Sequence, residues 1–366
     1  MLKSFLCVNM LLTVLKACDR SPGLRKNIVS QLVNRVDGIC SWMSVLLNTS
    51  TLKNMISPFS LEQERETYSW HAELILSIAN IDYRLQQSLM SSPALFHLFS
   101  RLWTSRDVKN QLLWFPESLN DCPVVRILLK IIAVNGHKGA FYQHLSDSHQ
   151  QLSQDLVDGI ARRIRLISSK NLPFTRAYQA FDDLIFITQR LFANEFLRGT
   201  LLRARCLSLM SSNLKTMLSL SPSSGKSLPR PPFRPLAAIY ECLRRTNAWS
   251  IKNWRDLVAE DFLASIVQIL PLLDGNDDHM STGRVLLREL RMYTLYPSVL
   301  ASHPLLTGCQ TPIIKDPKAS DIWSSFKRSL DERVYVYKHM WNRDILEICD
   351  NLSVRKDFLS FTNIGY

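Results

Sequence analysis

The amino-acid sequence predicts an all-α protein, either an irregular helical-repeat solenoid of the armadillo or HEAT type or a less regular multi-helix array. Three observations carry this prediction. Glycine is scarce, with 11 residues in a chain of 366, whereas sandwich and barrel folds need many turns. Apolar residues recur at steps of three and four, which is the spacing of one helical face. Prolines separate the periodic runs, so each run is expected to form its own helix.

The first half of the chain shows this pattern most clearly. A helix is expected at 5–15, where a secretory signal peptide is the less favoured alternative because Asn9 and Thr13 interrupt the apolar run. Ser60 and Gln63 form a potential capping box, and Ser92 followed by Pro93 is typical of a helix start. The run at 124–134 is predicted to be a helix, with a buried strand as the alternative. One stripe within 24–47 comprises Val29, Val33, Val36, Cys40, Met43 and Leu47.

The second half continues in the same way. Further helices are predicted at 152–167, 178–192, 196–218, 236–245, 251–273, 284–295, 321–340 and 344–352. A segment rich in Pro and Ser at 219–235 is predicted to be a linker or a loop. The sequence therefore indicates an N-terminal helical array at 1–218, a C-terminal array at 236–352 and a poorly ordered tail at 353–366.

The net charge of +12 is unevenly distributed, because residues 121–235 hold 16 basic and only seven acidic side chains. A basic surface can bind nucleic acid or an acidic partner, although a solvated helix face is the favoured interpretation without a recognised reader motif. Arg198 and Arg205 are expected to share one helix side, away from Arg203. The candidate basic patch comprises Arg162, Arg163, Arg165, Arg198, Arg203, Arg205, Arg230 and Arg234.

The eight cysteines favour an intracellular protein of the cytoplasm or nucleus. No two of them form a C-x-x-C pair, and several lie on apolar helical faces, so we expect small buried thiols rather than a disulfide framework. The sequence contains no run of 18 apolar residues, so no membrane span is predicted.

No local motif predicts catalysis or a resident cofactor. Gly225-Lys226-Ser227 lacks the earlier glycine of a phosphate-binding loop, and His137, His144 and His149 lack metal-ligand spacing and are expected in an exposed polar loop. We therefore expect a non-enzymatic protein that binds other proteins. An enzyme with a site dispersed along the chain and a nucleic-acid-binding protein remain the alternatives.

The C-terminal region resembles the fungal MYND-type zinc-finger proteins. The resemblance rests on Trp323, Phe326 and Arg333 in a predicted helix and on the later Cys349-Asp350-Asn351. In that family a cysteine-rich finger holding two zinc ions follows such a segment, and the helical region implies a protein-interaction role. Here Cys349 stands alone, because residues 352–366 contain no Cys or His. A structural zinc needs four ligands, so we expect no metal site.

Overall fold

The computed structural model describes residues 2–18, 20–56, 61–106, 112, 122–136, 139–147, 151–169, 173–220, 233–246, 250–272, 277–302, 314 and 317–339. Over these residues the regular structure is helical, and the only extended pairing is an isolated bridge between Arg106 and Leu112. The all-α prediction is confirmed, and the run at 124–134 is a helix rather than a strand. No helix among them is long and apolar enough to cross a lipid bilayer.

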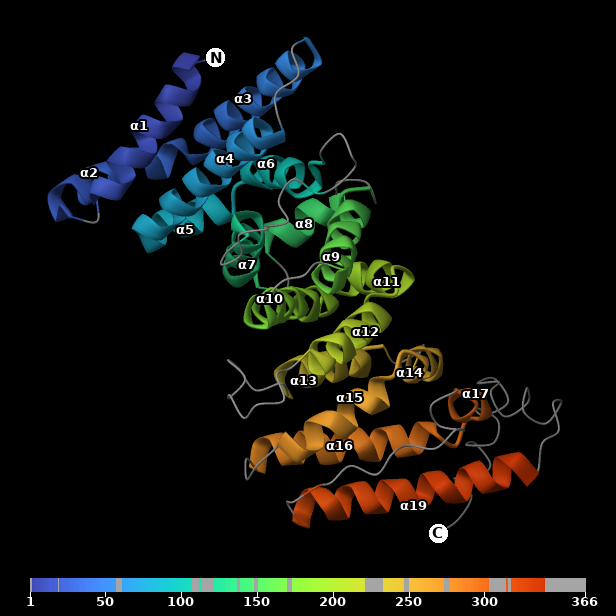
Figure 1. Cartoon of the computed structure of the whole chain (residues 1–366). Helices are drawn as coiled ribbons and strands as arrows, with labels where there is room; N and C mark the ends of the chain where they lie inside the picture. Colours follow the sequence, from blue (N-terminus) through green and yellow to red (C-terminus); the bar gives the residue numbers. More distant parts are fainter. Residues whose placement is uncertain are drawn as a thin grey trace, which may run out of the picture. The chain divides into compact units, whose positions relative to one another are not determined.

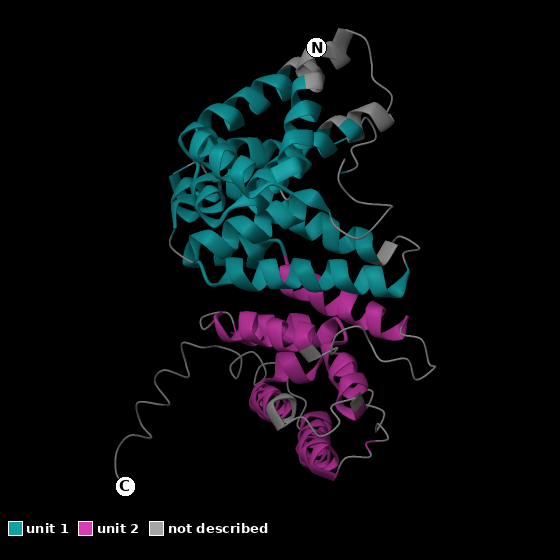
Figure 2. Cartoon of the chain, turned by 90° about the vertical axis from the view of Figure 1, so that its left-hand side faces the viewer, with its two compact units in different colours: residues 1–204 teal, residues 205–366 magenta. Residues whose placement is uncertain are grey.

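Tertiary contacts divide the chain into two compact units, residues 1–204 and 205–366 (Figure 2). This division differs in place from the predicted linker at 219–235, most of which lies outside the described residues. Residues 233–235 of that segment already belong to a helix. Pro235 is tolerated there because it stands in the first helical turn, where no backbone N–H is required. The predicted tail at 353–366 also lies outside the described residues.

The first unit is a series of long helices with shorter ones between them (Figure 1). In chain order the helices are α1 (Leu2–Cys18), α2 (Pro22–Leu32), α3 (Val36–Ile56), α4 (Leu61–Ile81), α5 (Tyr83–Met90), α6 (Pro93–Thr104), α7 (Pro123–Asn135), α8 (Ala140–Asp147), α9 (Gln151–Ser169), α10 (Phe174–Phe192) and α11 (Glu195–Arg203). A short 3₁₀ turn, η1 (Val33–Arg35), joins α2 to α3.

Helices three positions apart pack against each other in this unit. Helix α1 contacts α4, α4 contacts α7 and α7 contacts α10, while α3, α6 and α9 form a second series. Two hydrogen bonds show that α3 and α6 run in the same direction. Ser92 at the start of α6 donates to Asp37 in the first turn of α3, and further along both helices Arg101 donates to Asn48. The short helices α2, α5 and α8 fall between members of the two series.

The apolar stripe predicted within 24–47 is largely buried, but it does not lie on one helix. Five of its six residues are at most 3% exposed, whereas Val33 is half-buried in the 3₁₀ turn that separates α2 from α3. The predicted start at Ser92-Pro93 is confirmed, since the Ser92 Oγ accepts a hydrogen bond of 3.1 Å from the backbone N–H of Leu95. The proposed cap at Ser60 lies outside the described residues.

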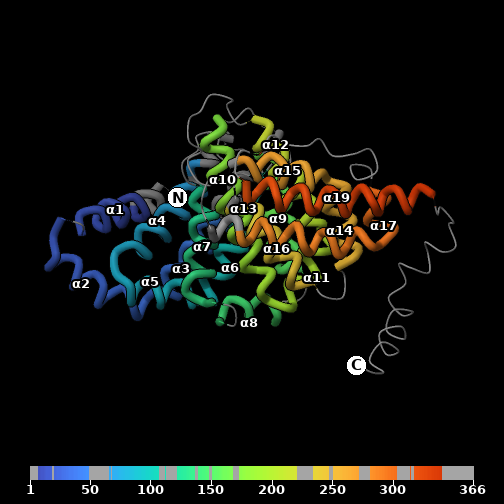
Figure 3. Tube along the Cα trace, turned by 90° about the horizontal axis from the view of Figure 1, so that it is seen from below, coloured from blue at the N-terminus to red at the C-terminus, as the bar shows by residue number. Residues whose placement is uncertain are grey.

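The second unit follows the same spacing. Its helices are α12 (Cys206–Ser219), α13 (Phe233–Arg244), α14 (Ser250–Ala259), α15 (Phe262–Ile269), α16 (Asp277–Tyr293), α17 (Pro297–Leu300) and α19 (Pro317–His339), with the 3₁₀ turn η3 (Leu270–Leu272) after α15. Helix α12 packs on α15, α13 on α16 and α16 on α19. Figures 1 and 3 both show α16 and α19 lying side by side.

Two helices predicted as continuous are each broken in the structure. The run at 196–218 divides between α11 and α12 at Arg205, and the run at 251–273 divides between α14 and α15 at Asp261. Both residues adopt the left-handed backbone conformation, with φ of 54° and 60°. A left-handed residue ends a right-handed helix, so neither pattern could continue past it. No glycine or proline marks either break in the sequence.

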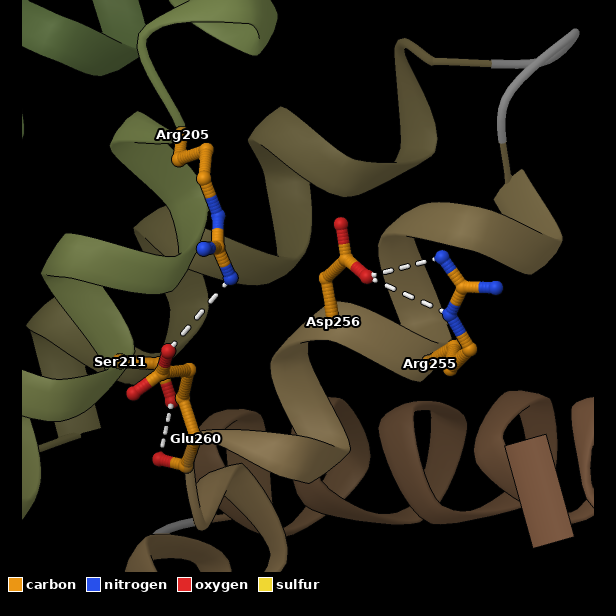
Figure 4. A network of polar contacts seen from close by, with 5 residues as sticks. All are labelled: Arg205, Ser211, Arg255, Asp256 and Glu260. Carbon is orange, nitrogen blue, oxygen red and sulfur yellow. Dashed lines mark hydrogen bonds and ion pairs between the residues drawn. The ribbon is translucent and has the colours of Figure 1, made fainter. Parts of the chain in front are cut away.

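Polar contacts join these two breaks to each other within the second unit (Figure 4). The Arg205 guanidinium lies 3.6 Å from the Glu260 carboxylate, and the Ser211 Oγ donates to the Glu260 backbone carbonyl at 3.3 Å. The Lys215 ammonium pairs with Asp261. The start of α12 is thus fixed against the turn between α14 and α15.

Candidate functional site

The eight arginines predicted as a basic patch are divided between the two units. In the first unit, Arg162, Arg163 and Arg165 lie on α9, and Arg198 and Arg203 lie on α11. Arg205 and Arg234 belong to the second unit, and Arg230 lies outside the described residues. The prediction that Arg198 and Arg205 share one helix side is wrong, because the break at Arg205 places them on different elements.

Arg163 also cannot contribute to a solvent-facing patch, because it is only 1% exposed. Its guanidinium lies 3.8 Å from the centre of the Trp103 ring and donates hydrogen bonds of 3.2 Å to the backbone carbonyls of Trp103 and Gly159. Burial lowers the pKa of Arg163 to about 10, with the neighbouring Cys122 acting in the opposite direction. The side chain therefore remains protonated at neutral pH and joins α6 to α9.

The prediction that His144 lies in an exposed polar loop is wrong, because His144 lies on helix α8. Its ring packs edge-on against that of His97 on α6, with the centroids 4.6 Å apart. Burial, and then the neighbouring His97, lower the pKa of His144, while Asp147 raises it. His137 and His149 lie outside the described residues.

No potential metal site is found in the part of the chain that the structure describes. There, no group of three or more His, Cys, Asp or Glu side chains could hold a metal ion. The position that carries the resemblance to zinc-finger proteins, Cys349, lies outside this part.

The candidate functional site is an open groove of about 420 Å³ between α16 and α19, in the second unit. Its cationic side chains come from both helices, and its floor is apolar. The lining residues are Arg284, Leu287, Arg288 and Arg291 of α16 and Lys318, Asp321, Ile322, Ser325 and Phe326 of α19. We call this site the α16/α19 groove.

Two hydrogen bonds of Arg333 hold the two helices of the α16/α19 groove together. Near the end of α19, Arg333 donates hydrogen bonds to the backbone carbonyl of Arg291 and to the Thr294 hydroxyl at the end of α16. Because the start of α19 faces the earlier residues of α16, the two helices run in the same direction. Burial, and then the neighbouring Arg291, lower the pKa of Arg333.

The floor of the groove is anchored in the core of the second unit. Leu287 is 1% exposed and Phe326 3% exposed. Phe326 packs against Trp323, with the ring centroids 5.6 Å apart, and Trp323 is itself 2% exposed. Trp323, Phe326 and Arg333, three of the residues that carry the family resemblance, thus all hold α19 in place.

Sequence reasoning missed this groove. The signal in the sequence is the spacing of Arg284, Arg288 and Arg291, which are four and three residues apart and therefore lie on one face of α16. The groove exists only because α19, about thirty residues later in the chain, packs beside that face.

Comparison with known proteins identifies no relative, because no protein-family model, no curated protein and no solved structure matches the chain.

Proposed function

We propose that the chain is a non-enzymatic scaffold that binds other proteins. The observation that carries the proposal is the α16/α19 groove, in which cationic walls flank an apolar floor. Interaction surfaces commonly combine a buried apolar centre with a polar, charged rim. The groove lies on helices held by core packing, so a partner would meet a preformed surface.

The ionisable groups with large pKa changes do not support an enzyme. Burial raises the pKa of the Cys40 thiol and of the Tyr142 hydroxyl, each to about 12, and neither residue lines the groove. Catalytic groups are usually found where such perturbed residues converge in a pocket. For Cys40 and Tyr142, burial in the core is the largest cause of the raised pKa.

We also propose that the helices form an irregular solenoid of the armadillo or HEAT type. The packing of helices three positions apart supports this, since each helix then meets its equivalent in the next repeat. The parallel direction of α3 and α6, and of α16 and α19, is what such stacking requires. Solenoids of this kind present extended surfaces to partners, which agrees with a scaffold.

Nucleic-acid or acidic-partner binding through the basic region at 162–234 is the second candidate. Arg165, Arg203 and Arg234 are exposed, which favours it, but Arg163 is buried and the remaining arginines are divided between two units. A nucleic-acid complex would lose affinity steeply as the salt concentration rises. Fluorescence anisotropy with labelled single-stranded and duplex oligonucleotides at low salt tests this candidate directly.

Membership of the MYND-type family and an intracellular location complete the proposal. The roles of Trp323, Phe326 and Arg333 in seating α19 give the shared pattern a structural reason. The buried thiols of Cys40 and Cys242 suit a reducing compartment, because each is free rather than paired in a disulfide.

The experiment that tests the scaffold function begins with the tagged full-length chain. Proteins that it recovers are identified, purified separately and titrated against the untagged chain by calorimetry, with size-exclusion chromatography and light scattering to give the stoichiometry. The expected result is a saturable complex of fixed stoichiometry with at least one of them. Failure of every purified candidate to bind, or turnover of a substrate by the chain alone, overturns the proposal.

A further inference from the structure

We propose that the α16/α19 groove binds an acidic amphipathic helix presented by a protein partner. This inference rests on the proposed scaffold function and adds the surface and the chemistry of the partner. It follows from the charges of the groove walls, the apolar floor between them and the spacing of the cations along α16.

The walls of the groove carry an excess of positive charge. The described residues that line it include four cations, Arg284, Arg288, Arg291 and Lys318, and one carboxylate, Asp321. Among the described residues, none forms an ion pair with the side chains of the three arginines. Like charges held close together repel each other, and an anionic partner relieves that repulsion while being drawn toward the groove.

The apolar floor indicates that charge is not the whole basis of recognition. Leu287 and Phe326 are buried beneath the cations, and Ile322 is half-buried beside them. Among the described lining residues, half-buried Ile322 and the aliphatic stems of the arginines offer apolar surface, so the groove suits a partner that places apolar side chains there and acidic ones over the cations. An amphipathic helix meets both needs when it lies along a groove between two other helices.

The cations have the spacing of a helical ladder. Arg284, Arg288 and Arg291 stand at positions i, i+4 and i+7 on one face of α16 and span about 10 Å along the helix axis. Carboxylates at the same spacing on a second helix lie along the same distance. An adjoining apolar stripe on that helix would then lie over Ile322 and the aliphatic stems of the arginines.

The same groove is poorly suited to nucleic acid. Single-stranded nucleic acids are held by stacking of bases on accessible aromatic rings as well as by charge. Among the described residues, the only aromatic one that lines this groove is Phe326, whose side chain is 3% exposed and already packed on Trp323. A phosphate backbone would find the charges but no surface on which its bases could stack.

The test uses the full-length chain and a defined probe. The probe is a fluorescein-labelled helical peptide of about 14 residues, with glutamates at i, i+4 and i+7 beside a stripe of leucines. Two matched peptides replace either the glutamates with glutamines or the leucines with serines. We expect saturable binding of the first peptide by fluorescence anisotropy, and binding weakened at least about tenfold for each of the other two.

Charge-reversal variants locate the binding site. Arg288→Glu and Lys318→Glu each reverse one exposed cation of the groove, and each is expected to weaken binding about tenfold or more. Arg35→Glu makes the same change at an exposed arginine in the first unit, and Lys338→Glu does so in the last turn of α19. These two controls should leave binding within about twofold of the unchanged chain. Far-UV circular dichroism checks that all four variants remain folded.

Several outcomes overturn the inference. They are equal binding of the glutamine peptide, equal loss in the control variants, or stronger binding of an oligonucleotide that Arg288→Glu abolishes. Self-association that Arg288→Glu abolishes would assign the groove to a second copy of the chain. Stronger peptide binding by a triple variant that combines Asp344→Asn, Glu347→Gln and Asp350→Asn would assign the groove to the chain's own acidic segment.

The scaffold function is tested separately from this site. If Arg288→Glu loses the peptide but retains a purified partner from the calorimetric experiment, that partner binds elsewhere, the assignment of the groove fails and the scaffold proposal stands. If no purified partner binds the unchanged chain, the scaffold proposal itself fails.

Discussion

Replacing Gly159 with alanine should destabilise the first unit, because α9 lies unusually close to the indole of Trp103 at this position. A Cβ atom built on Gly159 would stand 2.1 Å from Trp103 Nε1 and 2.9 Å from two carbons of the ring. Trp103 is 1% exposed and its Nε1 donates a hydrogen bond of 3.1 Å to the Leu156 carbonyl. The indole must therefore move, and it cannot do so without breaking this contact.

Opposing contributions decide the size of the effect. Overpacking a core costs about 1–3 kcal/mol, and loss of the indole hydrogen bond costs about 1 kcal/mol. Alanine is better than glycine within a helix by about 1 kcal/mol, which partly offsets these costs. The displaced ring also weakens its contact with the Arg163 guanidinium. The net expectation for Gly159→Ala is a loss of about 1–3 kcal/mol in the free energy of unfolding.

Scanning calorimetry of the full-length chain measures this change. A loss of 1–3 kcal/mol corresponds to a fall of roughly 2–12 °C in the midpoint of the first unit, at about 2–4 °C per kcal/mol for a body of this size. Gly199→Ala is the matched control, because a Cβ there meets nothing within 4 Å on helix α11. That variant should gain about 0.5–1 kcal/mol. If Gly159→Ala raised the midpoint as Gly199→Ala does, the close approach of α9 to Trp103 would be refuted.

Three further results are expected. The free energy of unfolding should fall as the pH rises above about 8.5, the ordinary pKa of an unfolded thiol. Burial raises the pKa of Cys40 to about 12 and that of Cys242 still further, so above pH 8.5 these thiols ionise in the unfolded chain but not in the folded one. Urea titrations from neutral to alkaline pH measure this, and a flat profile would contradict it. Arg205→Gly should be more stable than Arg205→Ala by about 1 kcal/mol, because glycine adopts the left-handed conformation of this position without the strain that a Cβ atom causes. Both changes remove the exposed ion pair with Glu260, so its loss cancels in the comparison. The reverse order in thermal unfolding would refute this strain. Ser92→Ala should lower the free energy of unfolding by about 1–2 kcal/mol through loss of the cap of α6 and of the hydrogen bond to Asp37, whereas Ser92→Thr, which keeps both the acceptor and the donor, should retain most of it in the same urea titration.

The helical periods in the sequence were sufficient to predict the fold class and most helices. Apolar residues at steps of three and four are buried in the stripe that holds Cys40, Met43 and Leu47. A capped start was also readable at Ser92, since both the hydroxyl and the following proline act locally. These features depend on residues within one or two turns of each other.

The breaks at Arg205 and Asp261 could not be read in the same way. Their left-handed conformation accompanies contacts between α12 and the turn after α14, which are about fifty residues apart in the chain. Arg163 was assigned to a surface patch because of its charge, although it lies three residues after the buried Ile160 and so falls on the core side of α9. Its burial depends on the Trp103 ring, which only the tertiary structure brings near.

The spacing of the helix contacts has a mechanical consequence. Within each unit, every substantial contact joins helices no more than three positions apart in the labelled series. Among the residues that the structure describes, no strand or distant segment closes either unit, so force applied to its ends need not break the whole core at once. Under tension each unit should lengthen in a sequence of small steps, as helices detach from an end one or two at a time. A single large rupture is the behaviour of folds whose terminal segments pair with each other.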